Sequence, residues 1–273
     1  MRTEWAGGKD AVKHSAGCDR PIPRWTDLRP RLSVDRLTCQ CLLFDMKLRE
    51  QAYIAFTKHL LERRLQPGQF VTQRDLAALT GFPLGAIREM IPRLEAEGLV
   101  KAIAQRGLQI ASIDPRLVRD AFHLREIIES TAIAEFVRTA SDETVRLHRG
   151  ALAAISAKAR SGGIDEALLA EAQSVDWGFH DAIVEHMGNA LLSDVHRVNA
   201  IRIRMMLYER VTLSPEVLPP ALGEHERIME AIEARDIAAA VAALQAHLAS
   251  ARRRALGLDG NDTAFSPRIA RRA

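Results

Sequence analysis

The sequence has few aromatic residues and no long apolar run, and each shortage excludes a class of protein. Aromatic residues make up 5% of the 273 residues, whereas apolar residues reach 47%. Together with the high alanine and leucine content, this favours packed helices over a sheet-rich sandwich. No run of about eighteen apolar residues exists, and the first ten residues lack the apolar segment of a signal peptide. We therefore expect a cytoplasmic protein.

Cysteine is also scarce, and its placement excludes a disulfide framework. All three cysteines lie near the N-terminus, at Cys18, Cys39 and Cys41. The Cys39-x-Cys41 pair could supply half of a metal site, but no second pair completes it. Incidental thiols are the favoured interpretation.

The stretch from Pro67 to Gly107 shows the pattern of two short helices followed by a hairpin. Apolar residues recur at helical spacing before and after Gly81, which permits a turn, and Gly98 ends the second helix. Two short apolar runs then flank the basic tip Gln105-Arg106-Gly107. This order predicts a winged helix-turn-helix, whose second helix enters the DNA major groove. A helix-turn-helix used only for protein contacts is the alternative.

Two features within this stretch carry local predictions. Thr72 is placed to cap the first helix, which puts Arg74 in the first turn, at the helix end that commonly faces a phosphate. Pro92 lies inside the second helix, where proline removes a hydrogen bond and crowds the carbonyl of Arg88. We expect a bend at Pro92 or an early change to a looser turn.

Charge is unevenly distributed along the chain although the net charge is only +3. Residues 46–113 carry ten lysines and arginines against six acidic residues, whereas residues 114–260 carry seventeen against twenty-two. The basic excess therefore coincides with the helix-turn-helix. This is the electrostatic pattern of a DNA-binding module joined to a domain with a different task.

The remaining patterns complete a mainly α fold with an N-terminal winged helix-turn-helix and a C-terminal antiparallel helical bundle. Asp114-Pro115 resembles a cap followed by a first-turn proline, and helical spacing continues to Leu256 with breaks that include Pro219-Pro220. The predicted domains are a disordered arm at 1–45, the winged helix-turn-helix at 46–113, the helical domain at 114–256 and a flexible tail at 257–273.

Four residues of the helical domain could meet at one metal ion. Asp176 and His180 are four residues apart and leave the same face of one helix. His225 and His247 lie among apolar neighbours on the last two helices and should point inward. One carboxylate with three imidazoles suits zinc first, with nickel or manganese as alternatives. Taken singly, each histidine is more often a packed or half-exposed residue than a ligand, and the remaining histidines, His196 among them, are interpreted in that way.

The motifs together resemble the GntR family of regulators. The segments PGQFVTQRDLA, TGFPLGAIREMIPRLEAEGLV and QRG resemble its N-terminal winged helix. LREIIES, the Asp176-x-x-x-His180 pair, Gly188-Asn189 and EHERIMEAIEARD resemble the all-helical (FCD-type) ligand-binding domain of the FadR-like subfamily. The resemblance covers about residues 47–256.

The resemblance implies a homodimeric transcription factor, a repressor or an activator, that binds double-stranded operator DNA and is controlled by a small effector. The effector expected is an organic acid bound near a divalent metal ion. By position, the metal ligands of metal-binding members correspond to Asp176, His180, His225 and His247. The DNA contacts correspond to Arg74, Arg88, Arg106 and Gly107, with Thr72 beside them. Leu84 stands where the family commonly has a polar or basic residue.

Three residues are candidates for binding an anionic effector, because a guanidinium matches a carboxylate with two parallel hydrogen bonds. By the resemblance they are Arg125 and either Asn189 or Arg202, which we expect to face one cavity; the guanidinium argument applies to the two arginines. For Arg125 a salt bridge to Glu129 is an equal alternative. For Arg202 an exposed charge is favoured.

Two other functions use the same residues. In the first, a regulator senses the metal ion itself, without an organic effector. In the second, an open Asp/His₃ metal site activates water and the protein is a hydrolase. We do not expect an enzyme, because no separate general base with a defined partner is found and a DNA-reading domain adds nothing to metal-dependent hydrolysis.

Overall fold

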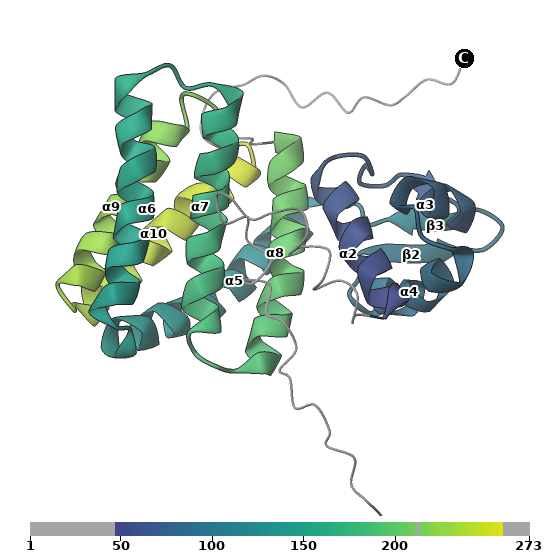
Figure 1. The fold of residues 1–273 in the computed structure, drawn as a ribbon, viewed down its shortest axis with the longest axis horizontal. Helices are drawn as coiled ribbons and strands as arrows, with labels where there is room; N and C mark the ends of the chain where they lie inside the picture. Colours follow the sequence, from purple (N-terminus) through teal and green to yellow (C-terminus); the bar gives the residue numbers. More distant parts are fainter. Residues whose placement is uncertain (1–46, 211–212, 259–273) are drawn as a thin grey trace, which may run out of the picture. The chain divides into compact units, whose positions relative to one another are not determined.

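The computed structural model describes residues 47–210 and 213–258 (Figure 1). The predicted arm at 1–45, with its three cysteines, lies outside the described residues. So do residues 259–273 of the predicted tail. Among the helices described, none combines the length and apolar character needed to cross a membrane.

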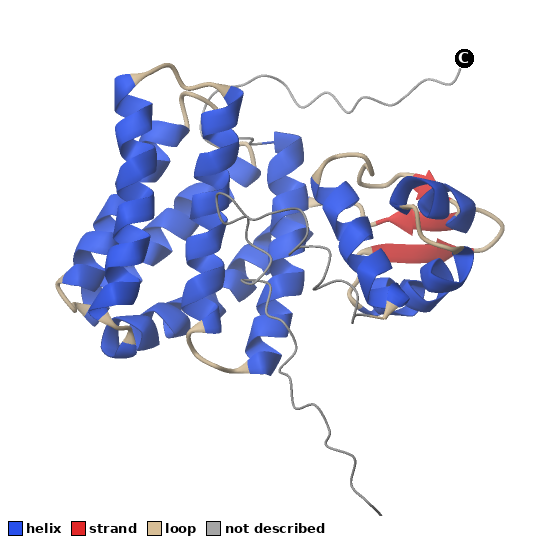
Figure 2. Cartoon of the chain, viewed as in Figure 1, coloured by secondary structure: helices blue, strands red, loops and turns tan. Residues whose placement is uncertain are grey.

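The N-terminal part of the described chain is a winged helix-turn-helix, as predicted (Figure 2). Its elements in chain order are α2 (Leu48–Leu61), β1 (Phe70–Val71), α3 (Gln73–Thr80), α4 (Leu84–Ala96), β2 (Val100–Ile103) and β3 (Gly107–Ile110). The three strands form an antiparallel sheet in the order β1-β3-β2, with Val71 opposite Leu108 and Ala102 opposite Leu108 on the other side. The sequence pattern had missed β1.

The turn chemistry of this domain explains its element boundaries. Thr72 caps α3 in a capping box: its hydroxyl accepts a hydrogen bond from the amide of Asp75 at 3.1 Å, and the Asp75 carboxylate accepts one from the amide of Thr72 at 2.8 Å. Gly81 then ends α3 in the left-handed conformation, with φ of 75°. These two positions fix α3 against the start of α4.

The looser turn considered at Pro92 does not form. Helix α4 continues as one α-helix through Pro92 to Ala96. Pro92 is exposed, on the side of α4 opposite the buried Ile91 and Leu94. On that side water can satisfy the carbonyl of Arg88 that has lost its intrahelical donor, which lowers the cost of the proline.

The core of this domain is apolar and includes side chains from outside it. Phe56, Leu76, Ile87, Leu94 and Ile110 are fully buried. Ile201 and Met205 of α8 belong to the same cluster, although they lie about a hundred residues further along the chain. The packing of the winged domain is therefore completed by a helix of the second domain.

The second domain is all helical within the described residues, as predicted. Its helices are α5 (Pro115–Thr139), α6 (Asp142–Ser161), α7 (Glu166–Glu185), α8 (Ala190–Arg210), α9 (Leu218–Glu233) and α10 (Ile237–Ala255). Asp114 caps α5 ahead of Pro115, as expected from the sequence. Long helix α5 packs against both α8 and α10, and α10 packs against α9. The core formed between them holds Ile133, Phe136, Ile183, Ile228 and Leu244.

The proline pair at 219–220 was expected to separate two helices, and this was wrong. Helix α9 begins at Leu218, so that both prolines lie in its first turn. The amides of a first turn have no intrahelical partner, and proline is therefore tolerated there.

Candidate metal centre and DNA interface

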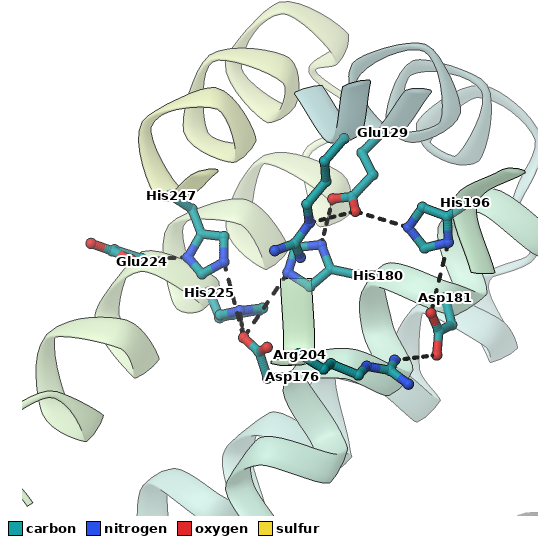
Figure 3. Close-up of polar contacts among 10 residues, drawn as sticks. Glu129, Asp176, His180, Asp181, His196, Arg204, Glu224, His225 and His247 are labelled. Carbon is teal, nitrogen blue, oxygen red and sulfur yellow. Dashed lines mark hydrogen bonds and ion pairs between the residues drawn. The ribbon is translucent and has the colours of Figure 1, made fainter. Parts of the chain in front are cut away.

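The four predicted metal ligands converge in the second domain. Helix α7 presents Asp176 and His180 one turn apart, α9 presents His225 and α10 presents His247 (Figure 3). One potential ligand atom from each lies within 4.8 Å of all the others. The three histidines are buried, at 2% exposure for His180, 6% for His225 and 3% for His247. The convergence that helical spacing alone could not establish is therefore present.

The potential ligand atoms of this cluster fit a divalent cation. The Nε2 atom of His180 is buried and has no hydrogen-bond partner. It lies 4.0 Å from Oδ1 of Asp176, as does Nε2 of His247, and Nε2 of His225 lies 2.6 Å from the same oxygen. A buried nitrogen aimed at a carboxylate, with two further imidazoles beside it, is a donor set for a borderline metal such as zinc.

Two glutamates orient the imidazole rings from outside the cluster. Oε2 of Glu129, on α5, lies 2.7 Å from Nδ1 of His180. Oε2 of Glu224, on α9, lies 2.9 Å from Nδ1 of His247. A carboxylate beside Nδ1 fixes the proton there and leaves Nε2 as a lone pair for a metal, which is the usual support of a metal-binding histidine. Both rings are thus held in the tautomer that binds a cation.

The electrostatics also favour metal binding. Burial raises the pKa of Asp176, but the imidazoles of His225, His180 and His247 outweigh burial and hold this pKa well below its usual range. Burial lowers the pKa of His180, and nearby Arg125 lowers it further. The lowered pKa of Asp176 favours an ionised carboxylate and that of His180 favours a neutral imidazole, and these are the forms that bind divalent cations.

The lowered histidine pKa makes the metal-free protein sensitive to mild acid. Burial, and then the neighbouring His225, lower the pKa of His247 to about 3 from 6.5. The unfolded chain therefore takes up this proton first, so the stability is complete above pH 6.5 and is lost as pH falls toward 3. We expect chelator-treated protein to lose about 1 kcal/mol of unfolding free energy per pH unit below pH 6 through this residue. Urea unfolding of wild type and His247→Gln at several pH values measures the difference, and equal slopes would contradict it.

A cavity lies directly beside the cluster and shares His180 with it. The cavity is small, about 20 Å³, and its wall includes Arg125, Glu129, Trp177, His180, Asp181, His196, Asn199 and Arg204. Arg125 donates to Oε1 of Glu129 at 2.7 Å, so the salt bridge considered from the sequence is present. Arg204 donates to Oδ2 of Asp181 at 2.9 Å and stacks on Trp177, with 4.5 Å from its guanidinium carbon to the ring centroid.

Two of the three predicted effector-binding residues lie elsewhere, which corrects the expectation that they share this cavity. Asn189 caps α8, where its side-chain oxygen accepts from the amide of Leu192 at 3.2 Å. Arg202 turns toward the first domain and donates to the backbone carbonyl of Glu97. The direction in which a helical side chain points changes with each residue along the 3.6-residue turn. The isolated motifs that contain Asn189 and Arg202 did not show which neighbours these side chains face.

Several residues of the site were missed from the sequence. Glu129 and Glu224 look like ordinary charged positions of amphipathic helices, and His196 was interpreted as a packed residue. Their roles depend on partners more than twenty residues away, such as His180 for Glu129 and His247 for Glu224. The only local signal was the spacing of Arg125 and Glu129, which predicted the salt bridge but not its burial.

The predicted DNA-contacting residues lie in the winged domain. Arg74 and Arg88 are exposed, on α3 and α4, and Nε of Arg88 donates to the side chain of Gln73 at 3.1 Å. Gln73, which the sequence analysis did not single out, thus orients the arginine of the second helix. Thr72 is occupied with capping α3, at the helix end beside Gln73. These contacts give α3 and α4 one shared polar face.

The tip of the hairpin is exposed and basic. Arg106 lies above the ring of Phe70, with 5.4 Å from its guanidinium carbon to the ring centroid. Gly107 has φ of 89°, and a Cβ added there would lie 2.8 Å from the carbonyl oxygen of Val71. Gly107 is therefore required for the approach of β3 to β1, whether or not DNA also approaches this backbone.

Comparison with known families assigns both domains. Residues 48–110 match the family described as bacterial regulatory proteins, gntR family, and residues 120–250 match the FCD domain. The chain is 27% identical over 192 residues to the HTH-type transcriptional repressor GlaR of Escherichia coli (strain K12), covering 69% of this chain and 87% of that protein. It is also 27% identical over 194 residues to the probable D-xylose utilization operon transcriptional repressor of Paenarthrobacter nicotinovorans, covering 70% and 81%.

A solved structure shows the same fold. E. coli McbR/YncC superposes with a TM-score of 0.65 at 17% identity, covering 78% of this chain and 98% of that one. The matched families and relatives are transcriptional regulators and not enzymes, which sets aside the hydrolase alternative. The chain therefore belongs to the GntR family of transcriptional regulators, with an FCD domain following its helix-turn-helix.

Proposed function

We propose that this regulator binds operator DNA as a cytoplasmic homodimer, and that an organic acid bound beside a divalent metal ion controls its DNA affinity. Zinc is the ion that the donor set suits first. The observation that carries the proposal is the position of His180, which belongs both to the ligand cluster and to the wall of the cavity. A ligand in the cavity would therefore lie next to the ion.

The charges of the cavity indicate how an acid could enter it. Both arginines of the wall already form ion pairs with carboxylates: Arg125 pairs with Glu129, and Arg204 pairs with Asp181. Glu129 is fully buried, whereas the side chain of Asp181 is 26% exposed. An incoming carboxylate can replace Asp181 at Arg204 more readily than Glu129 at Arg125, because Asp181 can turn to solvent. We therefore assign effector binding to Arg204 together with Arg125 and the ion.

Control by the ion alone is the second candidate. Four protein ligands complete a tetrahedral zinc site without a position for another ligand, as structural zinc sites do. In that case the cavity would have no part in regulation, and metal occupancy would set the DNA affinity.

Separate titrations distinguish these functions. Gel-shift measurements with the DNA upstream of the chain's own gene are made with metal-free protein, with zinc, and with zinc plus each of a series of small organic acids. We expect an acid to change the affinity 5- to 150-fold only when zinc is present, which is the usual range of such coupling. A change with zinc alone would favour the metal-sensing function. Absence of any selective shift in all three states would contradict the proposal, and light scattering of the same samples tests the dimer.

A further inference from the structure

Glu129 joins the metal cluster to helix α8. Its side chain is fully buried on α5, between α7 and α8. Oε2 faces Nδ1 of His180 at 2.7 Å, and Oε1 faces Nε2 of His196 at 3.0 Å (Figure 3). Because an ionised carboxylate only accepts hydrogen bonds, both imidazoles donate to it. One carboxylate therefore fixes a metal-ligand candidate on α7 and a cavity residue on α8 at the same time.

Arg197, the residue that follows His196 on α8, binds the DNA-reading domain. Arg197 donates to the hydroxyl of Tyr53 at 2.7 Å and to Oε1 of Glu97 at 3.2 Å. Arg202, further along α8, donates to the backbone carbonyl of Glu97. Glu97 is the C-terminal cap of α4, the helix expected to read the DNA. Two arginines of α8 thus bind the end of that helix.

The contacts of Glu97 make this attachment specific. Tyr53 donates to Oε2 of Glu97 at 2.5 Å, and Arg93 donates to Oε1 at 3.0 Å. Arg93 also lies over the ring of Tyr53, at 3.9 Å from its centroid. The end of α4 is therefore held by a network of charged hydrogen bonds, in which the contribution of α8 is Arg197 and Arg202.

We propose that Glu129 is a positioning residue that transmits metal occupancy at His180 to α8, and through Arg197 and Arg202 to the end of α4. This inference rests on the proposed metal binding. An ion bound to Nε2 of His180 fixes the ring, and the ring then fixes the carboxylate of Glu129. The second oxygen of that carboxylate holds His196, and with it the adjacent turn of α8.

Glu224 provides a matched control within the same site. It supports His247 at 2.9 Å, as Glu129 supports His180, but its other partners, Arg254 and Ser250, lie with His247 on α10. Both glutamates should therefore contribute to metal affinity, by about 10- to 100-fold each as supporting carboxylates do. Of the two glutamates, only Glu129 also contacts α8.

The test combines zinc affinity with amide hydrogen exchange in the full-length protein. Zinc binding is measured by competition with a chromophoric chelator, and exchange is followed in α8 and at the end of α4 with and without saturating zinc. In wild type we expect zinc to slow exchange in both segments by about tenfold. Glu224→Gln should bind zinc 10- to 100-fold more weakly yet keep this protection at saturation. Glu129→Gln should show a similar loss of affinity and also lose the protection.

A second variant covers the event that Glu129→Gln does not fold. His196→Leu removes the side chain that donates to Glu129 from α8 and offers no replacement donor, so its zinc affinity should stay within about threefold of wild type while the protection is lost. Equal protection in wild type and His196→Leu, or zinc binding without any change in α8 of wild type, would overturn the inference and leave the metal site intact. Failure of wild type to bind zinc would overturn the inference together with the proposed metal binding.

Discussion

His225→Ala is expected to lower zinc affinity by about two orders of magnitude. His225 lies closest to Asp176, at 2.6 Å, and is one of four side chains that converge on one point. Apparent binding free energies of four-ligand zinc sites are about 10–16 kcal/mol, so that one ligand of four accounts for roughly 3 kcal/mol. The variant keeps its fold but loses an imidazole that no neighbour replaces.

Two measurements check this prediction. Chelator competition gives the affinity directly. Thermal unfolding gives an independent value, because zinc at a hundred times its dissociation constant stabilises the folded state by about 2.7 kcal/mol. For a chain of this size we expect wild-type Tm to rise by roughly 5–10 °C with zinc and the variant's Tm to stay nearly constant. His123→Ala removes an exposed histidine of α5 and should behave as wild type. Equal zinc affinity in His225→Ala and wild type would show that the cluster is not the metal site.

Arg88→Ala is expected to abolish selective DNA binding. The exposed face of α4 carries Gly85, Arg88, Glu89, Pro92 and Arg93. Arg93 is engaged with Glu97 and Tyr53, which leaves Arg88 as the cation best placed on this face to form a bidentate contact with guanine. Such a contact contributes about 1–3 kcal/mol of discrimination, and a dimer would lose it twice.

The measurement compares the affinity for upstream DNA with that for a shuffled sequence at fixed salt. We expect the ratio for Arg88→Ala to fall to near one, with the non-specific affinity reduced only slightly. Lys58→Ala, which removes an exposed charge from α2, is the control and should keep the ratio. Leu84→Arg places a guanidinium where the family commonly has a polar side chain and should change which bases are preferred. If Arg88→Ala keeps its selectivity, the prediction is wrong and other residues contact the bases.

The fold was largely predictable because its elements are amphipathic. The second domain buries one stripe of each helix, and pairs such as Phe179 and Ile183 on α7, or Ile228 and Ile232 on α9, show the four-residue spacing that reveals it. Strand β1 was missed because Phe70 and Val71 are too short a segment to show alternation. It exists through pairing with Gln109 and Leu108, and pairing across about forty residues leaves no local signal.

Only those site residues that show a pattern with their neighbours in the sequence could be predicted. Asp176 and His180 share a helix face, the apolar neighbours of His225 and His247 indicated that both point inward, and the family resemblance favoured a shared metal site. Glu129 could not be found in this way. A glutamate in a helix is ordinarily solvated, and its complete burial depends on His180 and His196, which are 51 and 67 residues away. The predicted position of Arg202 in the cavity was wrong for the same reason, because its partner Glu97 belongs to the other domain and is distant in the sequence.

The core of the winged domain has a consequence for how such regulators can be recombined. Because Ile201 and Met205 of α8 fill part of that core, the DNA-reading domain is not an exchangeable module. A chimera that joins residues 48–113 to an unrelated effector domain would leave unfilled space in this core, where α8 packs on α2, and large-to-small changes of this kind cost about 2–5 kcal/mol each. We expect a stable DNA-reading domain only in chimeras that keep α8, or in which Ile201 and Met205 are transferred together with residues 48–113.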